Sequence, residues 1–140
     1  MKRRFVLDAW AVLALLQGEE PAASRVRQLL NDAQGGNSDC FISIINLGEV
    51  LYRVGKVKGE AEAWQTLEQL RRLTMTVVPA GEEAVLAAAG FKMHYAISYA
   101  DALAAATAGE RDATLVTGDS ELGSLNERIR IEMLERSGRG

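Results

Sequence analysis

The chain has 140 residues, of which 48% are hydrophobic and 6% aromatic, and its formal net charge is −3. This length supports one compact domain with a single core and is too short for two domains of ordinary size. The negative net charge excludes a global electrostatic attraction to nucleic acid. A nucleic-acid partner would therefore be bound by local cations or through a metal ion.

The single cysteine, Cys40, cannot form an internal disulfide, and its apolar neighbours in CFISII indicate a small buried side chain. We therefore expect a reducing, cytoplasmic setting. Basic residues precede an apolar run at the N-terminus, but Asp8 interrupts that run and no Ala-x-Ala-like cleavage site follows. This segment is interpreted as a strand and a helix, not as a signal peptide. No apolar stretch approaches the roughly 20 residues that a transmembrane helix needs, so we expect no membrane partner.

In the first half of the chain, short apolar runs that suit buried strands alternate with helical patterns. RFVL predicts a strand, and AWAVLALLQG predicts a helix that ends at Gly18, a residue suited to a helix C-cap. Pro21 suits the first turn of a second helix, which the loop AQGGNSD ends. CFISI then predicts a strand, INLGEVLYRVG a helix ending near Gly55, and KGEAEAWQTLEQLRRL an amphipathic helix.

The second half repeats this alternation. TMTVV predicts a strand, GEEAVLAAAGFKMHY and SYADALAAATAGE predict two helices, and ATLVT and IRIEML predict the closing strands. Strands that are continuously apolar and separated by helices indicate a mainly parallel sheet with helices on both faces, a three-layer α/β fold. With no repeat and no long linker, residues 1–135 are expected to form one domain, followed by a frayed tail at residues 136–140.

Four carboxylates from separate segments fall where predicted strands end or helices begin: Asp8, Glu49, Asp101 and Asp119. In open parallel sheets, the ligand crevice lies outside the carboxyl ends of the strands. If these four segments face the same crevice, their carboxylates converge there.

Each acid also has a local explanation. Asp8 could be a helix N-cap, which is worth about 1 kcal/mol. SYAD has the form of a capping box, in which Ser98 is the cap and Asp101 reaches back. Glu49 could be a solvated helix residue, or the far end of a second capping box opened by Asn46.

Asp119, which follows Gly118, would alone be interpreted as a turn residue. Taken together, however, two carboxylates about 4 Å apart repel each other by about 4 kcal/mol at an effective dielectric near 20, so four would need a countercharge. A divalent cation is the simplest countercharge, because Mg²⁺ and Mn²⁺ accept ligation by oxygen alone. Zinc is not expected, since Cys40 and His94 are the only soft or imidazole ligands.

Four blocks occur in this order along nearly the whole chain: FVLDAWAVLALL, NLGEVLYRV, SYADALAAATA and LVTGDSEL. With these blocks the chain resembles the PIN-domain nucleases, and among them the VapC-type toxins of toxin–antitoxin pairs. The resemblance implies a Rossmann-like α/β fold and an endoribonuclease site dependent on Mg²⁺ or Mn²⁺. It assigns site positions to Asp8, Glu49, Asp101, Asp119, the hydroxyl residue Thr117 and the auxiliary acid Glu121.

We expect a division of roles among these residues. Asp8, Asp101 and Asp119 are expected as direct or water-bridged metal ligands, Glu49 as a residue that orients a water or a second ion, and Thr117 as the support of Asp119 or of a metal-bound water. The resemblance implies products with 5′-phosphate and 3′-hydroxyl ends, consistent with attack by an activated water.

One position departs from the family pattern. Trp10 stands two residues after the first aspartate, where the family usually has Ser or Thr, and an indole offers no oxygen to a metal. Either the indole packs beside the site or the local metal geometry is altered.

Three partners are expected from the resemblance: an RNA substrate, a cognate antitoxin and a second copy of the chain in a homodimer. A basic rim for RNA could come from Arg25, Arg27, Arg53, Lys56 and Lys58, which could equally be ordinary solvated charges. A groove for an antitoxin helix could include Leu16, Val26 and Leu30, which could equally be core residues.

Other classes of protein fit less well. An aspartyl-nucleophile phosphatase needs a second aspartate where Trp10 stands, and a receiver domain needs an acceptor aspartate after its third strand, which TMTVVPAG does not offer. No G-x-G-x-x-G motif or P-loop follows a strand. Two alternatives stay open: a PIN-like binding module that has lost turnover, and an RNA-processing nuclease that is not a toxin.

Overall fold

The computed structural model describes residues 2–136. Its strands are β1 (Arg3–Leu7), β2 (Ser38–Ser43), β3 (Thr76–Val78), β4 (Thr114–Thr117) and β5 (Ile131–Met133). Its helices are α1 (Ala9–Gln17), α2 (Ala22–Gln34), α3 (Ile44–Lys58), α4 (Glu60–Arg71), α5 (Glu82–His94), α6 (Tyr99–Glu110) and the 3-10 helix η1 (Ser120–Leu125).

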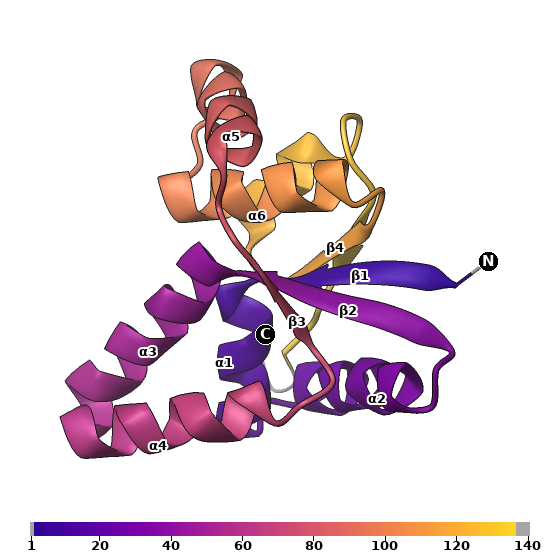
Figure 1. The fold of residues 1–140 in the computed structure, drawn as a ribbon. Coiled ribbons are helices and arrows are strands. Elements are labelled where there is room, and N and C mark those ends of the chain that lie inside the picture. Colours follow the sequence, from indigo (N-terminus) through magenta and orange to yellow (C-terminus); the bar gives the residue numbers. More distant parts are fainter. Residues whose placement is uncertain (1, 137–140) are drawn as a thin grey trace.

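The five strands form one parallel sheet in the order β3-β2-β1-β4-β5. Helices α1 to α4 lie on one face of this sheet, whereas α5 and α6 lie on the other (Figure 1). This arrangement follows from right-handed crossovers, because the chain moves outward from β1 to β3 and then returns past β1 to β4. The predicted three-layer α/β fold is confirmed.

Two hydrophobic clusters hold the layers together, one on each face of the sheet. Phe5 and Leu7 of β1 pack with residues of α1 to α4, whereas Val6 packs with residues of α5, α6 and η1. Alternate residues of a strand point to opposite faces, so one apolar run supplies both clusters. The central strands β1 and β4 are therefore buried toward their carboxyl ends, and polar residues can gather where these strands end.

Helix ends show where the sequence pattern predicted well and where it did not. Gly18 caps α1 in a left-handed conformation with a φ of 67°, as predicted. Helix α3 does not end near Gly55 but continues to Lys58, and the chain turns at Gly59 with a φ of 96°. Gly55 lies inside the helix, and a Cβ at this position would be in ordinary van der Waals contact, at 3.5 Å, with the Cβ of Ala63 on α4. The helix therefore ends at the glycine with a positive φ, Gly59, and not at Gly55.

The two open interpretations of the early helices are now decided. Val26 is fully buried and Leu30 is 7% exposed, so both belong to the core and cannot line an antitoxin groove, while Leu16 is 38% exposed. The expected loop at residues 33–39 is also shorter, because α2 continues to Gln34 and β2 begins at Ser38.

The C-terminal segment returns to the early part of the chain, where Arg136 forms an isolated antiparallel bridge with Pro21. The rest of the expected frayed tail, residues 137–140, lies outside the described residues. Among residues 2–136, no helix is both long enough and apolar enough to cross a membrane.

Candidate metal centre

The central strands β1 and β4 end side by side, and each is followed by an aspartate. Leu7 pairs with Val116 in the sheet, and the backbone N–H of Asp8 donates to the carbonyl of Val116 at 3.3 Å. Asp8 therefore lies beside Thr117, and Thr117 is two residues before Asp119 in the sequence. The carboxyl ends of parallel strands thus bring together two acids that are far apart in the sequence.

Asp8 is a buried carboxyl group that is also a helix cap. It is 1% exposed, and its Oδ1 accepts a hydrogen bond of 2.9 Å from the N–H of Ala11 in α1. Burial raises the pKa of Asp8 to about 7; the Thr117 hydroxyl and the Ala11 N–H oppose this shift, and the charges of Asp119 and Glu49 add to it. Asp8 can cap α1 and also belong to the site, because its Oδ1 accepts the capping hydrogen bond and its second oxygen is left for another partner.

Thr117 and Asp119 form a local hydrogen-bonded unit where β4 ends. Thr117 is fully buried, and its Oγ1 accepts a 3.0 Å hydrogen bond from the N–H of Asp119. The Oδ1 of Asp119 in turn accepts from the N–H of Glu121 at 2.9 Å and caps η1. This unit fixes the direction of the Asp119 carboxylate as the chain leaves the sheet.

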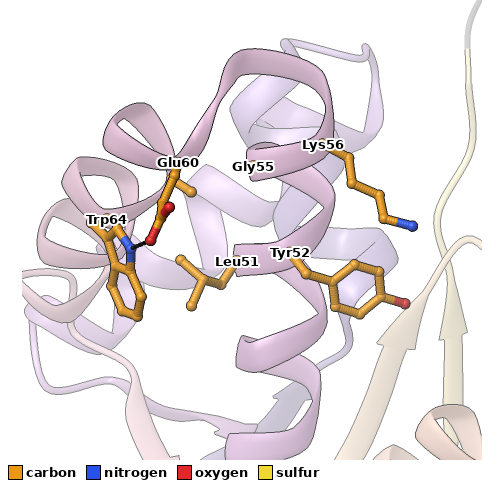
Figure 2. A pocket seen from close by; sticks show the side chains of 7 residues that line it. Leu51, Tyr52, Gly55, Lys56, Glu60 and Trp64 are labelled. Atoms are coloured by element: carbon orange, nitrogen blue, oxygen red, sulfur yellow. Dashed lines mark hydrogen bonds between the residues drawn. The ribbon is translucent and has the colours of Figure 1, made fainter.

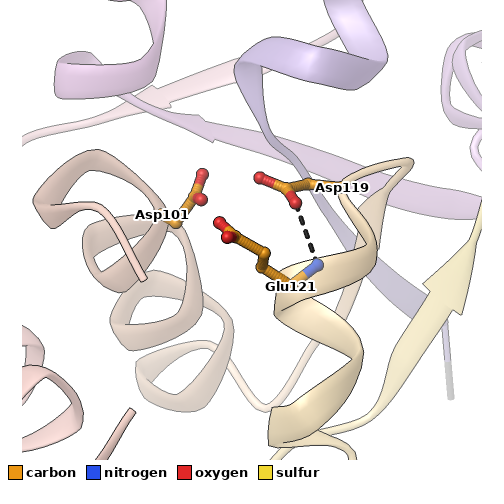
Figure 3. Close-up of side chains that lie close together, drawn as sticks. All are labelled: Asp101, Asp119 and Glu121. Carbon is orange, nitrogen blue, oxygen red and sulfur yellow. Dashed lines mark hydrogen bonds between the residues drawn. The ribbon is translucent and has the colours of Figure 1, made fainter. Parts of the chain in front are cut away.

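Three carboxylates lie closest together: those of Asp101, Asp119 and Glu121. One carboxylate oxygen from each residue lies within 4.8 Å of an oxygen from each of the other two. Figure 3 shows the three side chains pointing toward one another from α6, from the chain after β4 and from η1. Glu121, which the sequence suggested only as an auxiliary acid, is thus a full member of this acidic cluster.

Asp101 responds to this environment. Ser98 caps α6 by accepting a 3.1 Å hydrogen bond from the N–H of Asp101, which confirms Ser98 as the predicted cap. The pKa of Asp101 is raised to about 7, first by burial and then by a hydrogen bond to Asp119 and the charges of Asp119 and Asp8, while a hydrogen bond with Ser98 opposes the shift. Without a cation, the neighbouring carboxyl groups disfavour the ionised form of Asp101.

Glu49 lies at the edge of the site and not inside the acidic cluster. Its side chain is 17% exposed and forms an ion pair of 3.0 Å with Arg53, one helical turn further along α3. Its charge still acts on Asp8. The second capping box expected for Glu49 is wrong: α3 begins at Ile44 and its cap is Ser43, so Asn46 lies inside the helix.

Asn46 is a residue that the sequence analysis did not place at the site. Its side chain is fully buried, and its Nδ2 donates to the carbonyl of Ala100 at 3.1 Å, directly before Asp101. Its Oδ1 is buried without a hydrogen-bond partner. Its position three residues before Glu49, on the same side of α3, is the one signal that could have identified it.

The donor set fits a divalent cation. Within residues 2–136, the only ion pair made by any of the site acids joins Glu49 to Arg53, so the negative charge of the acidic cluster is not balanced by protein cations. Carboxylate oxygens and a buried hydroxyl are the ligands and supports that Mg²⁺ and Mn²⁺ accept. Asp8, Asp101, Asp119 and Glu121 are the residues that could hold such an ion.

Trp10 packs beside the site. A Cβ built on Gly118 would lie 2.3 Å from atoms of the indole, so the ring rests directly against the backbone of this glycine. The guanidinium of Arg136 lies over the same indole, 5.2 Å from its centre. The sequence left two alternatives: either the indole packs beside the site or the metal geometry is altered. The structure has the indole packed beside the site, against Gly118 directly after β4.

The expected basic rim is largely neutralised by neighbouring acids. Arg25 binds Glu132 through two hydrogen bonds of 2.6 and 3.0 Å, and Arg27 pairs with Glu20 at 3.4 Å. Because Arg53 is paired with Glu49, only Lys56 and Lys58 of the five cations lack an acidic partner among the described residues.

Comparisons with known proteins agree with this architecture. A family model described as PIN domain matches residues 5–127. The structure of VapBC2 from Rickettsia felis bound to a promoter DNA fragment contains a chain with a TM-score of 0.73 and 20% identity, covering 94% of this chain and 99% of that one. DNA-bound VapBC from Salmonella typhimurium gives a TM-score of 0.72 and 19% identity, covering 95% and 98%.

A third similar structure is VapC20 from Mycobacterium tuberculosis, described as a Sarcin-Ricin loop cleaving toxin. It has a TM-score of 0.68 and 13% identity, and the match covers 86% of this chain and 93% of that one. Comparison of the sequence with curated proteins gave no match. At these identities the three structures share the fold of this chain.

Proposed function

Because the chain belongs to the PIN domain family, whose model matches residues 5–127, we propose that it is an endoribonuclease dependent on Mg²⁺ or Mn²⁺. The observation that carries this proposal is the acidic cluster of Asp101, Asp119 and Glu121, whose oxygens lie within 4.8 Å of one another beside the buried Asp8. An unbalanced group of carboxylates at the carboxyl ends of parallel strands is suited to a divalent cation.

In this proposal the acidic residues bind the metal ion, and the neighbouring polar residues orient them. Asp8, Asp101 and Asp119 are metal ligands, directly or through water, and Glu121 is an auxiliary ligand. The chemistry that a bound cation supplies is the polarisation of a phosphate and the acidification of a water molecule. Thr117 orients Asp119 through the 3.0 Å hydrogen bond, and Glu49 orients a water at the edge of the site. Attack by water on phosphorus, with departure of the 3′ oxygen, gives 5′-phosphate and 3′-hydroxyl ends.

We further propose that the chain is the toxin of a type II toxin–antitoxin pair and acts in the cytoplasm. Support comes from similar structures: two are described as VapBC complexes, and a third as a toxin that cleaves the Sarcin-Ricin loop. An RNA substrate and a cognate antitoxin are the partners that this assignment requires.

A surface suited to the antitoxin lies between α3 and α4. Here a hollow of about 320 Å³ is lined by Leu51, Tyr52, Gly55, Lys56, Glu60, Ala63 and Trp64 (Figure 2). Tyr52 and Trp64 are about half exposed, at 52% and 51%. An apolar groove between two helices accepts the apolar face of a third helix. We assign the antitoxin to this hollow instead of to the buried Val26 and Leu30.

The homodimer remains part of the proposal. Leu86 and Met93 lie seven residues apart on one side of α5 and are 63% and 77% exposed. Exposed apolar side chains at this spacing form a stripe that a second copy of the chain could cover.

The function is tested by incubating the purified protein with structured RNAs in Mg²⁺, Mn²⁺ or chelator. We expect cleavage that requires a divalent cation, leaves 5′-phosphate ends, and is lost in Asp119→Asn. Cleavage that survives the chelator would count against the metal mechanism. No cleavage under any condition would favour the alternative of a PIN-like binding module, which the indole at position 10 keeps open. Cleavage with no effect on growth would favour a processing nuclease.

A further inference from the structure

At the opposite end of the sheet from the acidic cluster, the structure has a second polar hollow. It has a volume of about 380 Å³ and is lined by Lys2, Arg3, Arg4, Asp112, Thr114 and Arg130. Arg3 and Arg4 begin β1, and Thr114 begins β4, so this hollow lies at the amino ends of the two central strands. Along β1, the four steps from Arg4 to Asp8 span about 13 Å, which separates this basic hollow from the acidic cluster.

The basic hollow carries an excess of positive charge. Lys2 is 3.7 Å from Asp39, and Arg130 pairs with Asp112 at 3.1 Å. Neither Arg3 nor Arg4 forms an ion pair with any other residue in the range 2–136. Four cations thus line a cavity whose own wall contains one acid, in a protein whose net charge is negative. Like charges gathered in this way favour an anionic ligand.

Two of the guanidinium groups are held in place by one turn of the chain. Arg4 donates from Nη1 to the carbonyl of Arg111 at 2.9 Å, and Arg130 donates from Nη2 to the carbonyl of Asp112 at 2.8 Å. Asp112 adopts the left-handed region, with a φ of 50°, in the turn between α6 and β4. A guanidinium has five N–H donors, so each of these groups keeps donors for a ligand while its position is fixed.

We propose that the basic hollow binds the phosphodiester backbone of RNA, as a second contact for the substrate away from the acidic cluster. Guanidinium forks match phosphate oxygens, and cations spread across the starts of two strands suit a chain of phosphates better than one small anion. The substrate identity rests on the proposed function, whereas binding at this hollow requires neither metal nor cleavage. An RNA that contacts both places must extend over several nucleotides.

The test measures binding in the presence of chelator, where the acidic cluster repels RNA and the basic hollow should dominate. A fluorescently labelled single-stranded RNA is titrated with the full chain, and anisotropy gives the affinity at several salt concentrations. The double variant Arg4→Ala/Arg130→Ala should weaken binding about tenfold or more. It should also lower the slope of log affinity against log salt by about 1.4, since each lost single-strand contact removes about 0.7.

The matched control is Arg71→Ala/Arg72→Ala, which removes the same charge from exposed positions at the end of α4 beside the edge strand β3. This control should bind RNA like the wild type. Equal weakening by both double variants would indicate a general charge effect and overturn the proposal, as would wild-type affinity in Arg4→Ala/Arg130→Ala. If that variant fails to fold in a thermal melt, Lys2→Ala/Arg3→Ala, two exposed residues at the same hollow, gives the same test.

Two further binding measurements identify the chemical class of the ligand. DNA of the same sequence should bind comparably, because the recognised group is the phosphodiester. A polyglutamate peptide that displaces RNA at equal charge concentration would overturn the proposal in favour of an acidic protein partner. The two proposals can fail separately. If the wild type does not bind RNA in chelator but still cleaves it with metal, only the proposal for the basic hollow is wrong. If the wild type binds RNA in chelator through the basic hollow but does not cleave it with metal, only the proposed nuclease function is wrong.

Discussion

The indole of Trp10 lies directly against the backbone of Gly118, the residue that joins Thr117 to Asp119. A Cβ at position 118 would lie 2.3 Å from Cη2, Cζ2 and Cζ3 of the ring, a distance that real Cβ atoms do not tolerate. Gly118 does not have a positive φ, so the glycine is required by the indole and not by backbone conformation. The position of Asp119 is therefore coupled to a side chain at the start of α1.

This contact predicts that Gly118→Ala is harmful only while the indole is present. The added methyl should destabilise the protein by about 1 to 3 kcal/mol through overpacking, and should weaken Mn²⁺ binding by displacing Asp119. Trp10→Ala/Gly118→Ala should recover most of the loss caused by the methyl group, as measured by a double-mutant cycle of urea unfolding and Mn²⁺ calorimetry.

Gly48→Ala is the control for the glycine substitution itself. A Cβ there meets nothing within 4 Å, and the residue lies inside α3, so alanine should leave stability unchanged or raise it by up to about 1 kcal/mol. An additive result for the Trp10 and Gly118 substitutions would contradict the coupling.

Removing one charge from the acidic cluster should stabilise the protein without metal. Asp119→Asn relieves repulsion with Asp101, so its Tm in chelator should exceed that of the wild type. The same variant should lose the rise in Tm that Mn²⁺ gives to the wild type, because ligand binding stabilises only a state that binds. Glu68→Gln, an exposed carboxylate on α4, should change neither value. Equal stabilisation by Mn²⁺ in Asp119→Asn and wild type would exclude Asp119 as a ligand.

The metal-free protein should be less stable at neutral pH than in mild acid. Asp8 and Asp101 have pKa values of about 7 in the folded protein, against 3.8 for the ordinary group. Between these values the folded state binds more protons than the unfolded state, so the free energy of unfolding falls as the pH rises from about 4 to 7.

Thermal melts in chelator measure this dependence. The Tm should fall by about 5 °C or more between roughly pH 5 and pH 8. Mn²⁺ should reverse the fall, because the cation favours the ionised carboxylates. A Tm that stays level or rises over this range in chelator would show that these two carboxyl groups ionise normally in the folded chain.

Asn46 should couple the position of Glu49 to that of Asp101. Asn46→Ala removes a buried 3.1 Å hydrogen bond to the carbonyl of Ala100, so we expect a loss of about 0.5 to 1.5 kcal/mol in unfolding free energy. Asn126→Ala, an exposed asparagine after η1, serves as the control and should have little effect on the unfolding free energy. Mn²⁺ affinity should fall only in Asn46→Ala; a change in stability alone would restrict Asn46 to a structural role.

The fold was predictable because its strands and helices have distinct patterns. A run such as RFVL supplies both cores from one strand, and periodic apolar residues mark the helices. The end of α3 was not predictable in the same way, because both Gly55 and Gly59 could end a helix and only the backbone conformation shows that the chain turns at Gly59. Val26 and Leu30 likewise could be assigned to the core only when the opposite layer was known.

The site was predictable in part. Position at a strand end identified Asp8 and Asp119, since the carboxyl ends of parallel strands meet. Sequence spacing could not show that Glu121 lies with Asp101 and Asp119, or that Glu49 turns toward Arg53, because those outcomes depend on side-chain direction. Asn46 was missed since its partner, the Ala100 carbonyl, belongs to a distant helix.

The central claim, that the acidic cluster beside Asp8 is a divalent-cation site, is tested most directly by isothermal calorimetry with Mn²⁺ at neutral pH. Wild-type protein should bind Mn²⁺ with at least one ion per chain, and Asp101→Asn and Asp119→Asn should each lose most of the affinity, while Glu68→Gln retains it. Wild-type binding that persists in both aspartate variants, or no Mn²⁺ binding by folded wild-type protein, would contradict the account.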